Sequence, residues 1–147
     1  MPPSTLPPPI APTTHVLQGK RILTVDDQPD STRMIRLALS ATLGIEVREV
    51  NDPFRALAAA LEFRPDAVLL DVEMPGMNGG VLWRQFRSHP DFKRLPVLFL
   101  TSRISEDECS PNAADATTQM LAKPITLARL TDRLIKLLAR NPGEKMT

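Results

Sequence analysis

Short apolar stretches alternate along this chain with longer amphipathic ones. Five of the short stretches are either continuously apolar or alternate strictly between polar and apolar positions, and they lie at residues 21–26, 45–50, 67–70, 96–100 and 118–122. Runs of this length and pattern predict β-strands. The most hydrophobic of them, at 67–70, is typical of a strand that is buried on both faces.

The stretches between these strands have the spacing of amphipathic helices. Apolar residues recur near helical spacing over 30–43, and Asp52 followed by Pro53 predicts the capped start of a helix that runs to about Arg64. A loop with Pro75, Gly76 and Gly79 leads to a helix carrying Val81, Leu82 and Phe86, and the leucines of 127–138 form an apolar stripe. Strands alternating with helices predict an α/β fold with a parallel sheet and helices on both faces.

The two ends of the chain differ in composition from the part between them. Six of the 15 prolines lie within residues 1–19, with Ser and Thr between them, so this segment is expected to be a disordered tail. Residues 141–147 are expected to be a flexible C-terminal tail. One domain is therefore predicted over residues 20–140.

Composition narrows the class of protein. The formal net charge is +1, which gives no argument for a nucleic acid or an anionic membrane as a partner. The single cysteine, Cys109, excludes an internal disulfide and a cysteine-based metal cluster. No apolar run is long enough to cross a bilayer, and the N-terminus lacks the pattern of a secretory signal. A cytoplasmic location is expected.

Polar side chains follow four of the five predicted strands. They are Asp26, Asp27, Asp71, Thr101 and Lys123. Alone, each has an ordinary explanation, because an Asp after a strand is often a turn former or a cap and a lone Lys is usually a surface charge. In open parallel sheets, however, ligands bind outside the carboxyl ends of the strands. We therefore expect these side chains to share one crevice.

Three neighbouring carboxylates repel one another, and one lysine does not offset their charge. A hard divalent cation such as Mg²⁺ is the natural complement, and Mg²⁺ beside a lysine and a hydroxyl is typical of phosphoryl chemistry. Because the set holds no Ser, Cys or His, the candidate nucleophile is a carboxylate, which forms an aspartyl phosphate.

Four motifs in this order resemble the receiver domain of two-component response regulators. They are Val25-Asp26-Asp27, the segment from Leu70 to Gly79, Leu100-Thr101-Ser102 and Ala122-Lys123-Pro124. The resemblance covers about residues 20–140. It implies a flavodoxin-like, doubly wound, five-stranded parallel sheet with strand order 2-1-3-4-5.

The resemblance also implies a role for each residue. Asp71 would be the nucleophile and phosphoacceptor, Lys123 would contact a phosphoryl oxygen and pair with Asp71 beforehand, and Thr101 would hydrogen-bond the phosphoryl group. The implied Mg²⁺ ligands are Asp27, Asp71 and the backbone carbonyl of Glu73, with Asp26 acting mostly through water. Pro124 would follow a cis peptide bond.

The implied partners are a histidine kinase or a histidine phosphotransfer protein as donor and an effector protein that the sequence does not identify. The resemblance also allows a homodimer. The domain would not be a turnover enzyme, since it would catalyse only its own phosphorylation and dephosphorylation. No effector domain follows the last predicted helix, so we expect a single-domain regulator or an N-terminal piece of a longer one.

Two features depart from the family pattern. Met120 stands where strand five normally carries an aromatic residue, and it is either part of the switch or a core filler. Between Thr101 and Thr118 an acidic segment is interrupted by Pro111, which predicts a short or late fourth helix. Glu73 and Arg103 are expected to form an ion pair over the pocket.

Two alternative functions remain open from the sequence. A phosphatase of the haloacid dehalogenase type also uses an Asp nucleophile and Mg²⁺, but Glu73 stands where its second Asp would be. A pseudo-receiver would be a docking module that is not phosphorylated.

Overall fold

The computed structural model describes residues 16–102 and 117–139, and the fold below refers to this part of the chain. Its strands are β1 (Arg21–Val25), β2 (Glu46–Val50), β3 (Ala67–Asp71), β4 (Val97–Thr101) and β5 (Thr118–Ala122). Its helices are α1 (Pro29–Leu43), the short η3 (Pro53–Arg55), α2 (Ala56–Phe63), α3 (Gly79–Ser88), the short η4 (Pro90–Phe92) and α5 (Leu127–Ala139).

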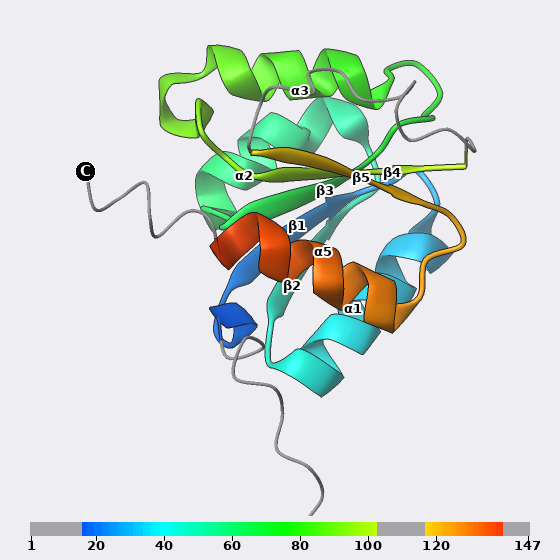
Figure 1. The fold of residues 1–147 in the computed structure, drawn as a ribbon. Coiled ribbons are helices and arrows are strands. Elements are labelled where there is room, and N and C mark those ends of the chain that lie inside the picture. Colours follow the sequence, from blue (N-terminus) through cyan, green and yellow to red (C-terminus); the bar gives the residue numbers. More distant parts are fainter. Residues whose placement is uncertain (1–15, 103–116, 140–147) are drawn as a thin grey trace, which may run out of the picture.

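The five strands form one parallel sheet in the order β2-β1-β3-β4-β5. Helices α2 and α3 cover one face of this sheet, and α1 and α5 cover the other (Figure 1). The predicted α/β fold, with its doubly wound sheet and strand order, is confirmed.

Each face of the sheet has its own apolar cluster because successive side chains of a strand point to opposite faces. The strand β4 illustrates this, since Phe99 packs in the cluster under α2 and α3 whereas Leu98 and Leu100 pack in the cluster under α1 and α5. All five residues of β3 and of β4 are buried, as expected for the central strands of a sheet covered on both faces.

Local sequence signals explain where two helices begin and end. Gly44 adopts a left-handed conformation with φ 68°, which ends α1 and lets its N–H bond to the carbonyl of Leu39. The Asp52 side chain accepts a hydrogen bond from the N–H of Phe54, which confirms the predicted cap. The capped turn is a short η3 helix that continues into α2.

Two arginines of α5, the helix that follows β5, donate hydrogen bonds to backbone carbonyls in and just after β5. The guanidinium of Arg129 on α5 donates to the carbonyls of Ala122 and Pro124 at 3.0 and 3.2 Å, and that of Arg133 donates to the carbonyl of Met120. The Met120 side chain itself is buried in the cluster under α2 and α3, and it pairs with Phe99 across the strands.

One predicted boundary was wrong. The tail was expected to reach residue 19, but Leu17 is fully buried and packs in the cluster under α1 and α5. The sequence prediction overlooked the apolar pair Val16-Leu17, which comes after the proline-rich segment and packs against the core just before β1.

Several other expectations fall on residues that lie outside the described part of the chain. They concern the structure of residues 1–15, Arg103, the acidic segment with Cys109 and Pro111, and residues 140–147. Among the described residues, no helix has the length and apolar character needed to cross a membrane.

Candidate functional site

Strand register brings the predicted residues to one edge of the sheet. Val25 pairs with Leu70, so Asp26, which follows β1, and Asp71, the last residue of β3, lie side by side. On the other side, Asp71 pairs with Leu100, just before Thr101. The N–H of Lys123, just after β5, donates to the carbonyl of Thr101 at 2.7 Å.

The Asp71 carboxylate is buried and held by two donors. It is 3% exposed, and its Oδ1 lies 3.3 Å from Nζ of Lys123 and 3.2 Å from the backbone N of Glu73. The Lys123 side chain is one-third exposed, so this ion pair joins a partly exposed ammonium group to a buried carboxylate. The Lys123–Pro124 peptide bond is cis, as the resemblance implied.

Asp26 lies deeper still and is only 1% exposed. Burial raises the pKa of its carboxyl to about 6, and the neighbouring charges of Asp71 and Asp27 raise it as well, although a hydrogen bond from the N–H of Gln28 and the charge of Lys123 act in the other direction. The raised pKa thus comes first from burial and then from the neighbouring carboxylates, whose charge Lys123 offsets only in part.

The donor set of this crevice fits a hard metal ion. Asp26, Asp27 and Asp71 each offer a carboxylate oxygen, and these three oxygens lie within 4.8 Å of one another. Oxygen-only donors of this kind suit Mg²⁺, Ca²⁺ or Mn²⁺ rather than a softer metal. A divalent cation among them would offset the repulsion from Asp71 and Asp27, which adds to the effect of burial on the pKa of Asp26.

Glu73 and Ser102 flank the crevice on the loops that follow β3 and β4. The Ser102 hydroxyl donates a 2.7 Å hydrogen bond to Oε1 of Glu73. The expected partner of Glu73 was Arg103, which lies outside the described residues. A side-chain hydrogen bond therefore joins the two loops, and within the described part of the chain the partner of Glu73 in it is Ser102.

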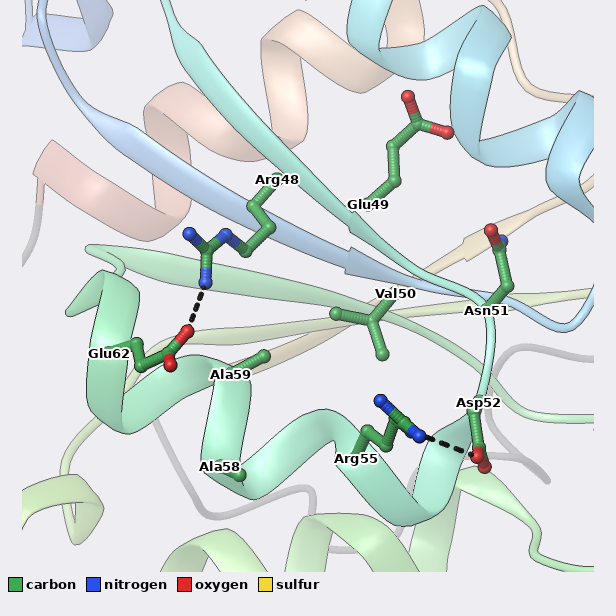
Figure 2. Close-up of a pocket in the computed structure, with 9 residues that line it drawn as sticks. All are labelled: Arg48, Glu49, Val50, Asn51, Asp52, Arg55, Ala58, Ala59 and Glu62. Atoms are coloured by element: carbon green, nitrogen blue, oxygen red, sulfur yellow. Dashed lines mark hydrogen bonds and ion pairs between the residues drawn. The ribbon is translucent and has the colours of Figure 1, made fainter.

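A separate groove of about 530 Å³ lies between the edge strand β2 and α2. Figure 2 shows that an ion pair stands at each end of it, Arg48 with Glu62 and Arg55 with Asp52. Its arginines are thus already paired with carboxylates, and none of the three clustered aspartates lines it. The groove is distinct from the acidic crevice.

One neighbour of the site was missed by the sequence reasoning. Asn51 comes directly after β2, and its Nδ2 donates to the backbone carbonyl of Asp26 at 2.8 Å. The rule that located the other residues, which looks just past the carboxyl end of each strand, points to Asn51 as well. An uncharged side chain did not stand out beside five charged or hydroxyl-bearing candidates.

Comparison with known proteins agrees with this geometry. The family model described as "Response regulator receiver domain" matches residues 22–135. The chain belongs to this family. Its receiver domain thus has the carboxylates, Thr101 and Lys123 at the edge of the sheet where the sequence motifs predicted them.

Relatives and solved structures point the same way. The receiver domain is 39% identical over 120 residues to the response regulator MprA of Mycobacterium leprae, which covers 82% of this chain and 51% of that protein. It is 32% identical over 125 residues to the DNA-binding response regulator MtrA of Mycolicibacterium smegmatis, covering 85% and 53%. The solved structure of the chemotaxis protein CheY4 of Vibrio cholerae aligns with a TM-score of 0.74 at 31% identity and covers 82% of this chain and 99% of that one. The chain spans about half the length of MprA and of MtrA.

Proposed function

We propose that this receiver domain accepts a phosphoryl group on Asp71 from a phosphohistidine donor, with Mg²⁺ bound beside it. The observation that carries the proposal is the position of the Asp71 carboxylate. It is buried within reach of the carboxylates of Asp26 and Asp27 on one side and 3.3 Å from Nζ of Lys123 on the other.

In the proposed reaction an Asp71 oxygen attacks phosphorus, a P–O bond forms, and the P–N bond to the donor imidazole breaks. The departing imidazole keeps the electron pair of that bond. The ammonium group of Lys123, which pairs with the Asp71 carboxylate before the reaction, then pairs with an oxygen of the phosphoryl group, so that it exchanges one anionic partner for another. Thr101 is fully buried beside Asp71, and we assign its hydroxyl to a hydrogen bond with another phosphoryl oxygen.

We assign the Mg²⁺ ligands to Asp27, Asp71 and the backbone carbonyl of Glu73, with Asp26 holding the ion through water. The bound ion would supply charge neutralisation for the phosphoryl oxygens and for the three carboxylates. The residues of the chain position the two reactants and exclude bulk water, since Asp26, Asp71 and Thr101 are each at most 3% exposed. The domain then acts on its own side chain only.

A histidine kinase or a histidine phosphotransfer protein is the proposed donor, since its phosphoimidazole is the leaving group that this reaction needs. The added phosphoryl group brings about −1.5 to −2 charges and three acceptor oxygens to the crevice. We propose that this change alters a surface recognised by an effector protein. DNA binding is stated in the name of MtrA for that protein as a whole, of which this chain matches about half.

The proposal is tested by intact-mass spectrometry of the wild type and the variant Asp71→Asn, each incubated with MgCl₂ and acetyl phosphate. The expected result is one added phosphoryl group on the wild type and none on the variant. Chelation of Mg²⁺ is expected to abolish the adduct. A folded wild type that stays unmodified by acetyl phosphate and by a phosphohistidine protein would contradict the proposal and favour a docking module that is not phosphorylated.

The same experiment separates the phosphatase alternative. A receiver domain consumes at most one phosphodonor per chain before its own aspartyl phosphate hydrolyses. Continuous release of phosphate at a rate that increases with donor concentration, without a stable adduct, is the outcome expected of a phosphatase.

A further inference from the structure

The backbone of Asp26 is held from several directions by the end of β2. Its N–H donates to the carbonyl of Val50 at 3.1 Å, and its carbonyl accepts from Nδ2 of Asn51 at 2.8 Å. Its Oδ1 also accepts from the N–H of Gln28 at 2.9 Å. Both backbone polar groups of Asp26, the first residue after β1, are thus held by hydrogen bonds.

The hydrogen bond from Asn51 has a consequence for Asp27. A peptide group is planar, so fixing the carbonyl of Asp26 also fixes the nitrogen of Asp27. The same plane contains Cα of Asp27, so the Asp27 side chain starts from a fixed Cα and its direction changes only by rotation about the N–Cα bond. The Asp27 side chain itself has one weak contact among the described residues, a 3.4 Å hydrogen bond from the Gln28 amide.

Asn51 is in turn oriented by a buried hydroxyl. Its Nδ2 donates its second hydrogen to Oγ1 of Thr32 at 3.0 Å, so that both hydrogens of the amide are used. Thr32 is fully buried in the first turn of α1. Because Thr32 Oγ1 is an acceptor for Asn51, its own hydrogen is free to be donated elsewhere.

The receiving group is the Glu49 carboxylate on β2. Oγ1 of Thr32 lies 2.8 Å from Oε1 of Glu49 and 3.1 Å from the carbonyl of Pro29, and the shorter contact to a charged acceptor is the stronger one. The other oxygen of Glu49 accepts from Nε of Arg36 on α1. The carboxylate therefore stays charged and holds the Thr32 hydroxyl in one orientation.

The alternation of β2 places Glu49 on the opposite side of the strand from Val50, although both Glu49 and Asn51 line the groove described above. Figure 2 shows Glu49 and Asn51 pointing away from α2, whereas Val50 and Arg48 lie on the side of α2. Arg48, on the same strand as Glu49, pairs with Glu62 of α2 and thus offers a comparison that does not involve Asp26.

We propose that Glu49, Thr32 and Asn51 form a positioning chain that sets the affinity of the receiver domain for Mg²⁺. The inference rests on the proposed function, because Asp26 and Asp27 are carboxylates of the assigned metal site. None of the three residues contacts the ion. They act through the backbone of Asp26 and the direction of the Asp27 side chain.

The test is a titration of each variant with MgCl₂, followed through the amide resonances of Asp27 and Gln28 by NMR. Thr32→Val removes the hydroxyl at nearly constant volume, and Asn51→Ala removes the amide from an exposed residue. Loss of an outer partner of a metal ligand weakens metal binding by about 10-fold to 100-fold. We expect the dissociation constant for Mg²⁺ to rise by about 10-fold in both variants and to stay near the wild-type value in Thr32→Ser.

Arg48→Gln is the matched control, and its Mg²⁺ affinity is expected to equal that of the wild type. Before Mg²⁺ is added, the Asp27 amide resonance is expected to shift in Asn51→Ala but not in Arg48→Gln. If Thr32→Val does not fold, the same comparison rests on Asn51→Ala.

The outcomes separate the inference from the proposed function. A wild type that does not bind Mg²⁺ overturns both. A wild type that binds Mg²⁺, with an unchanged affinity in Asn51→Ala, overturns the positioning chain alone. Equal weakening in Thr32→Val and Thr32→Ser also overturns it, since the loss would then come from packing and not from the hydroxyl.

Discussion

Oγ of Ser102 lies 2.7 Å from Oε1 of Glu73, so a hydrogen bond joins the loop after β3 to the loop after β4 directly beside the phosphoacceptor candidate. Glu73 follows Asp71 by two residues, and Ser102 follows Thr101. The bond therefore holds a carboxylate next to the crevice that the proposed anionic phosphodonor would enter.

Replacing Glu73 by Gln removes this negative charge while leaving a group that can accept from Ser102. Because acetyl phosphate is an anion, we expect the variant to be phosphorylated roughly threefold faster than the wild type at low ionic strength, with the difference shrinking as salt is added. The rate is measured by intact mass over time. Ser102→Ala keeps the charge and loses the bond, and an equal acceleration in this variant would show that the bond, not the charge, matters.

Lys123→Ala is expected to act in opposite directions on two properties. Since Nζ of Lys123 pairs with Asp71 at 3.3 Å, its removal takes away a cation that competes with Mg²⁺ for the carboxylate, and Mg²⁺ binding should tighten by about fivefold. Phosphorylation should slow by about 100-fold, because a preorganised charge on the phosphoryl oxygens is lost. Lys136→Ala, which removes an exposed lysine paired with Asp132, should change neither. Parallel losses of binding and rate would contradict this role.

We expect Asp26 to make the metal-free protein less stable at neutral pH than at mildly acidic pH. Its pKa is about 6 in the folded chain against an ordinary value of 3.8, so the folded state is penalised above pH 6 and the penalty disappears as the pH falls toward 4. In the presence of a chelator, Asp26→Asn should raise the free energy of unfolding at pH 8 by on the order of 3 kcal/mol at most, and less at pH 5. Urea unfolding at both pH values measures this, with the exposed Asp30→Asn as control. A gain that does not depend on pH would exclude the carboxylate as its cause.

Glu49 has the opposite dependence on pH. Burial by itself raises the pKa of its carboxyl, but hydrogen bonds from Arg36 and Thr32 together with the positive charges nearby lower it below its ordinary value. The stabilisation is therefore present above the unfolded pKa and is lost as the pH falls through the folded one. Glu49→Gln should lower the free energy of unfolding by about 1 kcal/mol at pH 7, and the difference from the wild type should narrow below pH 4. Glu46→Gln, at an exposed residue of the same strand, should have little effect at either pH.

Two adjacent glycines at the start of α3 should differ sharply when replaced by alanine. A Cβ at Gly79 would stand 2.8 Å from the carbonyl oxygen of Asp71 and 3.1 Å from Cα of Val72, both backbone atoms that cannot move aside. Gly79→Ala should therefore lower the free energy of unfolding by about 2 kcal/mol and weaken Mg²⁺ binding, because the backbone of Asp71 shifts. At Gly80 the nearest atom is the side-chain oxygen of Asn78 at 3.3 Å, so Gly80→Ala should be nearly neutral. Chemical denaturation of both variants decides the comparison.

The fold was predictable because two periods dominate this sequence. The continuous apolar run of 67–70 and the stripe of 127–138 each permit one kind of element, and polar residues just past the strands mark the functional edge of a parallel sheet. The boundary near Leu17 was predicted wrongly because the proline-rich composition of the segment hid two apolar residues, Val16 and Leu17, that pack only in the tertiary structure.

The contacts around the site could not be predicted in the same way. The hydrogen bond from Ser102 to Glu73 was not predicted, and the ion pair that was predicted, Glu73 with Arg103, involves a residue outside the described part of the chain and stays a prediction. A hydroxyl or an amide has many allowed partners, and the choice among them depends on ångström-scale geometry that a linear pattern does not encode. Thr32 and Asn51 went unnoticed for the same reason.

The guanidinium groups of Arg129 and Arg133 occupy backbone carbonyls at the β5 edge of the sheet. At β5 the outward carbonyls of Met120 and Ala122 already have donors from the chain's own helix, so a strand from another molecule would first have to displace two arginines. Open strand edges are where chains recruit one another into aggregates. The two arginines should therefore hinder pairing of β5 with a strand of another molecule. The same strand is followed directly by Lys123, the lysine of the proposed phosphorylation site.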